Sequence, residues 1–151
     1  MEIADLITPA YAICGMKAED KTRLLAELSR RAAGALSIPQ AVIEEALRAR
    51  EALGSTGVGA GIAIPHARIP GLARFFGIFA QLDRRIDYEA VDDEKVDLVC
   101  LLLVPMEATS EHLQALASIS RRLRDAGVAA RLRKADTAAR LYEILTNAAS
   151  A

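Results

Sequence analysis

Tryptophan is absent from this chain of 151 residues, and only three phenylalanines and three tyrosines are present. A surface that stacks nucleic-acid bases needs aromatic rings, so a nucleic-acid-binding function is disfavoured. The formal net charge is −1, which provides no basic footprint for nucleic acid and no attraction to an anionic membrane. We therefore expect no nucleic-acid partner, no membrane insertion, and a core built from aliphatic side chains.

Cysteine is also scarce, with only Cys14 and Cys100. The two have no Cys-x-x-Cys spacing and lie in apolar, strand-like runs, so we expect small buried hydrophobic residues in a reducing compartment. No basic segment followed by an apolar one marks a signal peptide at the N-terminus. The longest charge-free apolar run, residues 98–105, is too short to span a bilayer. These features predict a cytoplasmic protein.

The length and the 52% content of apolar residues predict a single domain over residues 1–151. Short apolar runs predict strands over residues 11–14, 62–64, 75–82 and 96–104. The last run is almost continuously apolar, which is typical of a strand buried on both faces. The polar segment between the last two strands has no helical pattern, so these strands should be antiparallel. The expected fold is an α/β sandwich in which helices flank a mixed parallel and antiparallel sheet.

Apolar residues at helical spacing predict a helix over residues 20–36 and a second one that follows Ser37-Ile38-Pro39-Gln40, a sequence typical of a capping box. Val42 and Leu53 of the second helix should face inward, and Gly54 should close it. Arg50 should lie in its last turn. Further helices are expected over residues 111–126, capped by Thr109 or Ser110 and stopping before Gly127, and from a cap at Asp136 through Thr146.

Basic residues gather in the C-terminal third of the chain. Such a cluster usually forms a solvated helix face, and the alternative is a docking surface for a partner. The residues are Arg121, Arg122, Arg124, Arg131, Arg133 and Lys134.

The most informative segment of the chain is residues 53–66, which contains four glycines and ends in Pro65-His66. Nucleotide-binding templates fail here. Gly54 and Gly59 have the P-loop spacing, but no Lys-Ser/Thr pair follows, and the dinucleotide fingerprint requires a glycine where Ile62 stands. The segment also follows a helix and precedes a strand, the reverse of the dinucleotide-binding order.

Metal binding and hydrolysis are poorly supported as well. The two histidines are distant in sequence, and the cysteines lie in apolar runs, so no metal-ligand spacing is present. No Gly-x-Ser-x-Gly elbow occurs. A neutral imidazole can itself attack phosphorus, so His66 is a candidate phosphoryl acceptor. Its ring should lie near the end of a strand.

The charge of a phosphohistidine needs donors. Backbone amides at Gly57, Gly59 and Gly61 could form an anion-binding nest, and the Arg50 guanidinium could bind phosphoryl oxygens. His112 is expected in the first turn of a helix, where anions are favoured. From spacing alone the alternatives stay open: surface histidines, an arginine that caps its own helix, and glycines that only form a turn.

Arg50-Glu51-Ala52-Leu53-Gly54-Ser55-Thr56-Gly57, followed by Gly61-Ile62-Ala63-Ile64-Pro65-His66, resembles the phosphorylation-site signature of the enzyme IIA proteins of the bacterial phosphotransferase system. The branch is the fructose, mannitol and nitrogen-regulatory one. Looser similarity extends over residues 5–9, 96–105 and 111–113.

The resemblance implies that His66 accepts a phosphoryl group from a phosphohistidine on a small HPr-type carrier protein. The family's arginine falls on Arg50 and its second active-site histidine on His112. No metal, nucleotide or other cofactor is implied, because donor and acceptor are protein side chains. We expect Ser55, Thr56 and the three glycines that follow to form the binding loop. Those glycines are Gly57, Gly59 and Gly61.

The resemblance leaves the acceptor open. The chain contains no IIB domain and no membrane span, which favours the nitrogen-regulatory form, a regulator whose phosphorylation state controls the binding of unknown target proteins. The alternative is a sugar-specific IIA that passes the phosphoryl group to a separate IIB. Two further hypotheses are an interaction module that is never phosphorylated and, as the weakest, a metal-dependent hydrolase.

Overall fold

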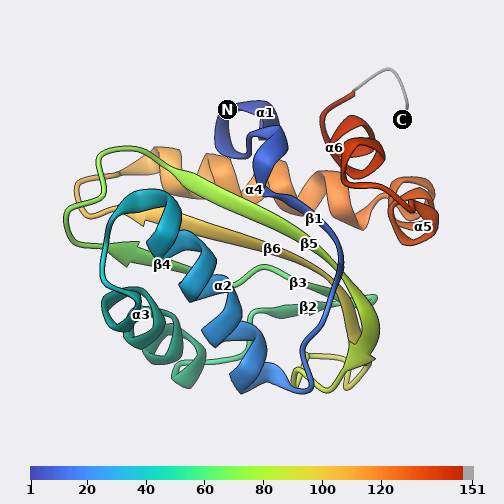
Figure 1. Cartoon of the computed structure of the whole chain (residues 1–151), viewed down its shortest axis with the longest axis horizontal. Helices are drawn as coiled ribbons and strands as arrows, with labels where there is room; N and C mark the ends of the chain where they lie inside the picture. The colour runs from blue at the N-terminus through green and yellow to red at the C-terminus, as the bar shows by residue number, and fades with distance from the viewer. Residues whose placement is uncertain (148–151) are drawn as a thin grey trace.

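A mixed six-stranded sheet forms the centre of the structure, a computed structural model that describes residues 1–147 (Figure 1). The last four residues of the predicted domain lie outside the described part. The strand order is β1-β5-β6-β3-β2, and β4 also pairs with β6. The strands are β1 Ala12–Met16, β2 Gly57–Gly59, β3 Ile62–Ala63, β4 His66–Ile69, β5 Phe76–Ile86 and β6 Val96–Pro105. β5 runs antiparallel to β6, whereas β3 and β4 run parallel to it. The predicted fold class is confirmed.

The central strand β6 is buried along its whole length, as its apolar run predicts. Successive side chains of a strand point to opposite faces, and those of β6 divide between two cores. Leu98 and Leu102 pack in the core on one face, and Val99 and Leu103 in the core on the other. Aliphatic side chains dominate both cores. β6 is therefore the element around which both layers assemble.

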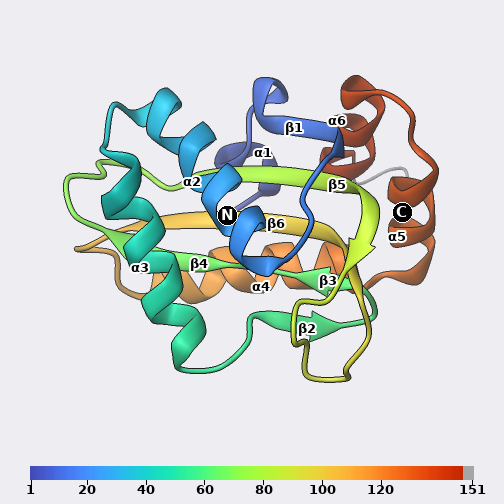
Figure 2. The same ribbon diagram turned by 60° about the horizontal axis from the view of Figure 1, so that its bottom comes forward.

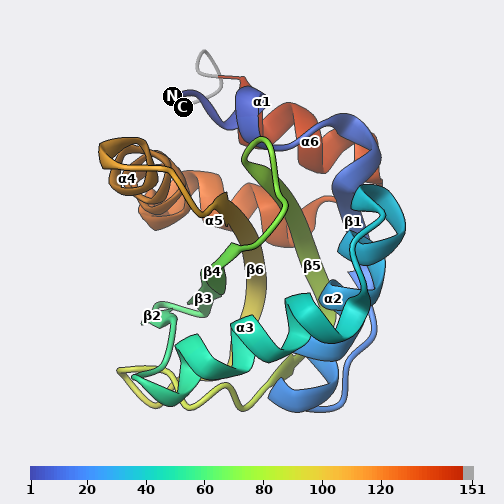
Figure 3. The same cartoon turned by 90° about the vertical axis from the view of Figure 1, so that its left-hand side faces the viewer.

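Helices cover both faces of the sheet (Figures 2 and 3). α2 and α3 lie on one face, and α1, α4, α5 and α6 lie on the other. A short 3-10 helix, Pro9–Tyr11, precedes β1. The helix bounds are α1 Ile3–Leu6, α2 Lys21–Leu36, α3 Gln40–Ala52, α4 Ser110–Arg124, α5 Ala126–Lys134 and α6 Ala138–Thr146.

The predicted start of α3 is wrong. Ser37 ends α2 in the left-handed region, with a φ of 57°, and its side chain makes no capping bond to α3. Pro39 occupies the N-cap position instead. Val42 and Leu53 are 37% and 85% exposed, because the buried stripe of this helix is carried by Ile43 and Leu47 alone.

The predicted helix over residues 111–126 divides into two helices. α4 ends at Arg124, and the Asp125 carboxylate accepts hydrogen bonds from the backbone N–H groups of Gly127 and Val128, at 2.9 and 3.1 Å. A glycine that was expected to lie beyond a helix end is therefore inside the first turn of α5. Thr137, not Asp136, caps α6.

The basic cluster is only partly a solvated face. The Arg133 Nε lies 3.0 Å from both carboxylate oxygens of Asp97, and Arg122 donates to the carbonyls of Ile144 and Asn147. Arg121, Arg124 and Lys134 are exposed. Two members of the cluster thus hold the C-terminal helices to the rest of the molecule, a role that neither interpretation of the sequence included.

The strand beside β6 is interrupted at Pro65. β3 pairs with β6 before this proline and β4 pairs with β6 after it, whereas β2 pairs with β3 only. Ala67 and Ile69 of β4 belong to the core under α2 and α3. Alternation along the strand therefore places the His66 side chain on the other face, the side on which α4 lies. We use the name β4 notch for this break, Ile64 and Pro65, together with the side chains that adjoin it.

Candidate functional site

His66 is the first residue of β4 and lies in the β4 notch. Its ring Nδ1 is 2.8 Å from the backbone oxygen of Ile64, and its Nε2 is 3.3 Å from the Nε of Arg50. A carbonyl oxygen can only accept and an arginine N–H can only donate, so Nδ1 carries the proton and Nε2 carries the lone pair. Both neighbours select the same tautomer. The His66 ring was expected near the end of a strand, and it lies at the N-terminal end of β4.

Arg50 comes from the last turn of α3, as predicted. Besides its bond to His66, the guanidinium donates through Nη1 to the backbone oxygen of Gly54, at 2.8 Å. Among residues 1–147 no carboxylate forms an ion pair with Arg50. The positive charge at the notch is therefore uncompensated by a neighbouring acid.

His112 lies in the first turn of α4 and is brought beside His66. The two ring centroids are 5.8 Å apart and the ring planes are inclined by 56°. The Nε2 of His112 is buried and has no hydrogen-bond partner among the described residues. A buried polar nitrogen without a partner is unfavourable, so this atom is suited to bind a group that comes to lie beside His66.

The surroundings keep both imidazoles neutral. Burial is the main reason why the pKa of His66 lies below its ordinary value of 6.5. The hydrogen bond to Ile64 opposes this shift, and the charges of Arg50 and His112 add to it. Burial also lowers the pKa of His112, and the charge of Arg68 contributes. A neutral His66 retains the lone pair that a nucleophile needs.

Arg68 belongs to the site but was missed in the sequence. It lies two residues after His66 on β4, and strand alternation, which places both on one face, was the available signal. Its Nη1 donates to the backbone oxygens of Pro105, Met106 and Ala108, at 3.3, 2.9 and 2.7 Å. Arg68 thereby fastens the loop that leads into α4.

The predicted binding loop divides into two parts. Ser55 and Thr56 lie close behind Arg50: the Thr56 hydroxyl hydrogen-bonds with the Glu51 carboxylate and the Tyr88 hydroxyl. The Ser55 hydroxyl donates to the Tyr88 backbone oxygen at 3.3 Å. Gly57 opens β2, where a Cβ atom would lie 2.7 Å from the Cβ of Ala90. These residues are packed inward.

Gly59 and Gly61 lie at the tip of the β2–β3 hairpin, and the structure does not bring them to His66. Both have positive φ angles, of 103° and 80°, which glycine adopts without strain. The nearest groups are the carboxylate of Asp92 for Gly59, and Arg133 with Asp97 for Gly61. The expected nest of glycine amides around His66 is therefore wrong, because a hairpin turn uses these glycines.

Three exposed apolar side chains lie close in sequence to residues of the site. Leu53 at the end of α3 is 85% exposed, Met106 in the loop before α4 is 50% exposed, and Leu113 beside His112 is 68% exposed. We call these three residues the apolar rim. Apolar side chains grouped around a polar site are typical of a surface that another protein contacts.

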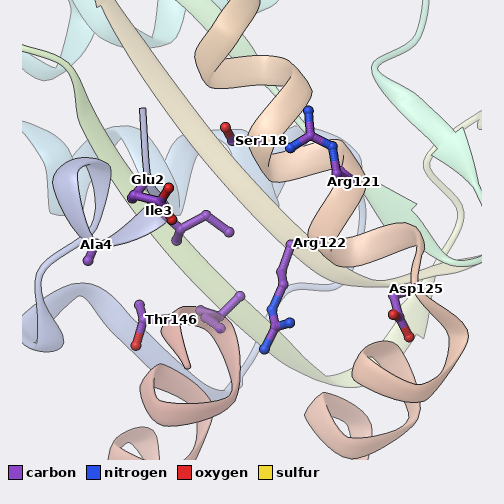
Figure 4. A pocket seen from close by; sticks show the side chains of 9 residues that line it. Glu2, Ile3, Ala4, Ser118, Arg121, Arg122, Asp125 and Thr146 are labelled. Atoms are coloured by element: carbon purple, nitrogen blue, oxygen red, sulfur yellow. The ribbon is translucent and has the colours of Figure 1, made fainter. Parts of the chain in front are cut away.

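A separate cavity of about 450 Å³ lies between α1, α4 and α6 (Figure 4). Its lining includes Glu2, Ser118 and Arg121 but no histidine or cysteine, and the Ser118 hydroxyl donates to the backbone oxygen of Met1. Within residues 1–147, no group of three or more metal-ligating side chains could hold a metal ion. No helix in that part of the chain is both long and apolar enough to cross a membrane. The candidate site is the β4 notch.

Comparisons with known proteins identify the family of the chain. Residues 5–148 match the family described as "Phosphoenolpyruvate-dependent sugar phosphotransferase system, EIIA 2". A nitrogen regulatory protein of Bradyrhizobium diazoefficiens is 44% identical over 145 residues, which cover 96% of this chain and 95% of the relative. The relative of the same description in Escherichia coli K12 is 42% identical over 130 residues, 85% of this chain and 80% of that protein.

A solved structure supports the same assignment. The crystal structure of nitrogen regulatory protein IIA-Ntr from Neisseria meningitidis has a TM-score of 0.90 and 33% identity, and the match covers 95% of this chain and 99% of that one. The chain belongs to the EIIA type 2 family of the phosphotransferase system and, within it, to the nitrogen regulatory proteins.

Proposed function

We propose that His66 accepts a phosphoryl group at Nε2 from a phosphohistidine of an HPr-type carrier protein. The phosphorylation state then controls binding to regulatory target proteins, within a nitrogen-related phosphotransferase system of the cytoplasm. One observation carries the proposal: Ile64 and Arg50 select the tautomer that leaves a lone pair on Nε2. The names of the relatives support the regulatory part.

The transfer needs no cofactor. The Nε2 lone pair of His66 forms a bond to phosphorus while the bond between phosphorus and the carrier's histidine nitrogen breaks, and the carrier's imidazole leaves with that electron pair. The proton on Nδ1 stays on the ring and keeps its bond to Ile64. Such a reaction depends on alignment and on stabilisation of the phosphoryl charge.

Two groups are suited to stabilise that charge. In the resting site the Arg50 Nε donates to the lone pair of Nε2, and it would turn to a phosphoryl oxygen as the new bond forms. The unpartnered Nε2 of His112 supplies a second contact from the side of α4. The apolar rim would contact the carrier around its phosphohistidine.

The test is an intact-mass measurement after incubation with phosphoenolpyruvate, enzyme I and an HPr-type carrier. We expect an acid-labile gain of one phosphoryl group in the wild type and none in His66→Gln, and heteronuclear NMR should locate the group on Nε2. An undiminished gain in His66→Gln would contradict the proposal.

Control of binding is tested separately. A pull-down with the phosphorylated protein, the unphosphorylated protein and His66→Gln should recover different partners from the first than from the other two. Identical partners in all three would leave an interaction module that phosphorylation does not govern.

A further inference from the structure

Arg50 and Glu51 are consecutive residues at the end of α3, yet their charged groups contact different parts of the molecule. Arg50 points to His66, whereas the Glu51 side chain turns inward and is only 7% exposed. Burying a carboxylate is unfavourable unless it is paired and hydrogen-bonded. The contacts of Glu51 therefore indicate what the fold gains from this acid.

Four donors satisfy the Glu51 carboxylate. The backbone N–H of Thr56 donates to Oε1 at 3.0 Å, and the Lys21 Nζ lies 3.0 Å from the same oxygen. The Thr56 hydroxyl donates to Oε2, and the single proton of the Tyr88 hydroxyl is shared between Oε2, at 3.3 Å, and the Thr56 hydroxyl oxygen, at 2.9 Å. Lys21 also lies over the Tyr88 ring, 4.6 Å from its centroid. We call Lys21, Glu51, Thr56 and Tyr88 the buried clamp.

The buried clamp acts on the loop that supports Arg50. Because Glu51 holds both the N–H and the hydroxyl of Thr56, the chain between Ala52 and Thr56 must turn back against the end of α3. The turn presents the backbone oxygen of Gly54 to the Arg50 Nη1, at 2.8 Å. This contact and the bond to His66 together fix the plane of the guanidinium.

The buried clamp also controls charge. Glu51 is the acid next to Arg50 in sequence, and its carboxylate lies 3.0 Å from the Lys21 Nζ of α2, which balances its negative charge. Arg50 thereby keeps an unpaired positive charge for an incoming anion.

We propose that Glu51, secured by Lys21, Thr56 and Tyr88, is a positioning residue that aims Arg50 at His66 and keeps the guanidinium free for the phosphoryl group. The inference rests on the proposed function of His66. Glu51 touches neither reacting atom and acts through Arg50.

The test compares hydroxyl-deleting variants with conservative ones, using phosphorylated carrier as the substrate. Thr56→Val should lower kcat about tenfold or more while KM for the carrier stays within about twofold, because the apolar rim is unchanged. Thr56→Ser, which keeps the hydroxyl, should recover most of the loss. Tyr88→Phe should resemble Thr56→Val, whereas Tyr11→Phe, in a ring that packs on Phe76, should match the wild type.

A double-mutant comparison separates positioning from general destabilisation. In an Arg50→Met background, Thr56→Val should have no further effect on kcat. The inference is overturned if the two losses multiply, if the loss is confined to KM, or if Thr56→Val transfers like the wild type below its melting temperature.

A spectroscopic measurement is independent of turnover. In the unphosphorylated protein, the NMR signals of the Arg50 Nε–H and the His66 Nε2 should report their hydrogen bond, and Glu51→Gln should weaken it. Should Glu51→Gln fail to fold, Thr56→Val and Tyr88→Phe provide the same readout. Unchanged signals would overturn the inference even if His66 proves to be phosphorylated. A wild type that accepts no phosphoryl group would instead refute the proposed function.

Discussion

At the scale of single residues, two neighbours set the tautomer of His66. Ordinary surface histidines exchange between two tautomers, whereas this ring is held by an acceptor on one nitrogen and a donor on the other. The bond between the His66 ring and its own backbone spans only two residues. The second contact, from Arg50, comes from α3 in a different layer of the fold.

His112 provides a residue-scale prediction. His112→Ala should lower kcat for phosphoryl transfer about tenfold to a hundredfold, since it removes a group that stabilises the charge of the transferring phosphoryl. His112→Gln, whose amide can still donate a hydrogen bond, should recover part of the rate. Rapid-quench kinetics with phosphorylated carrier measure the effect, and thermal melts check the fold. Loss of the folded state in His112→Ala would indicate a packing role instead.

At the scale of elements, the β2–β3 hairpin supports the site from a distance. Its tip is held by Asp92, whose carboxylate accepts from the Ala60 N–H at 2.9 Å, and by Arg133, which donates to the Ala60 oxygen at 2.7 Å. Its base carries Thr56 of the buried clamp. The hairpin thus connects the α5 layer to the loop behind Arg50.

Gly61→Ala should destabilise the protein by about 2 kcal/mol, because alanine is strained at a positive φ and its Cβ would lie 2.5 Å from the Arg133 Nη2. Denaturant unfolding measures the loss. Gly34→Ala is the matched control: that glycine lies in α2 with open space around it, so the substitution should stabilise by about 1 kcal/mol. Phosphoryl transfer below the melting temperature should be unchanged in Gly61→Ala. A strong loss of rate with intact stability would revive the nest of amides.

The sequence predicted the elements better than their ends. The run over residues 96–104 is almost continuously apolar, and its shortness favours a buried strand over a buried helix. Ser37 misled because its local sequence suits a capping box, whereas in the structure it has a left-handed backbone conformation and ends α2. The break at Asp125 was missed for a similar reason. Its carboxylate caps a second helix, and the sequence alone does not show that the chain bends there.

For the site, sequence reasoning brought Arg50, His66 and His112 together, and the structure places all three at the notch. It could not reveal the buried clamp, because Tyr88 lies within the polar segment between two strands and meets Glu51 only through tertiary packing. It also misjudged the glycines, since a positive φ serves a hairpin turn and an anion nest equally well.

At the scale of the whole molecule, the two histidines of the site make the free energy of unfolding depend on pH. The pKa of each lies below its ordinary value in the folded protein, so the unfolded chain binds protons more readily as the pH falls through about 6.5. The contribution of these groups to the free energy of unfolding is fully present above that pH and is lost as the pH falls below it. We expect the free energy of unfolding to decrease from about pH 8 to about pH 5.5.

Urea denaturation across this range measures the pH dependence. His66→Gln and His112→Gln should each flatten it, because an amide does not titrate. A curve for His66→Gln as steep as that of the wild type would show that other groups cause the dependence.

The interruption of the strand beside β6 also matters before the chain is folded. Arg50, His66 and His112 are distant in sequence, and their meeting requires the pairing of β6 with β4 and β5. Contacts of such long range form late, so a nascent or partly unfolded chain presents only an ordinary histidine. Under the proposed function, a phosphate on His66 is therefore a mark that only the finished fold acquires. A signalling pathway that read this mark would count intact molecules rather than chains synthesised.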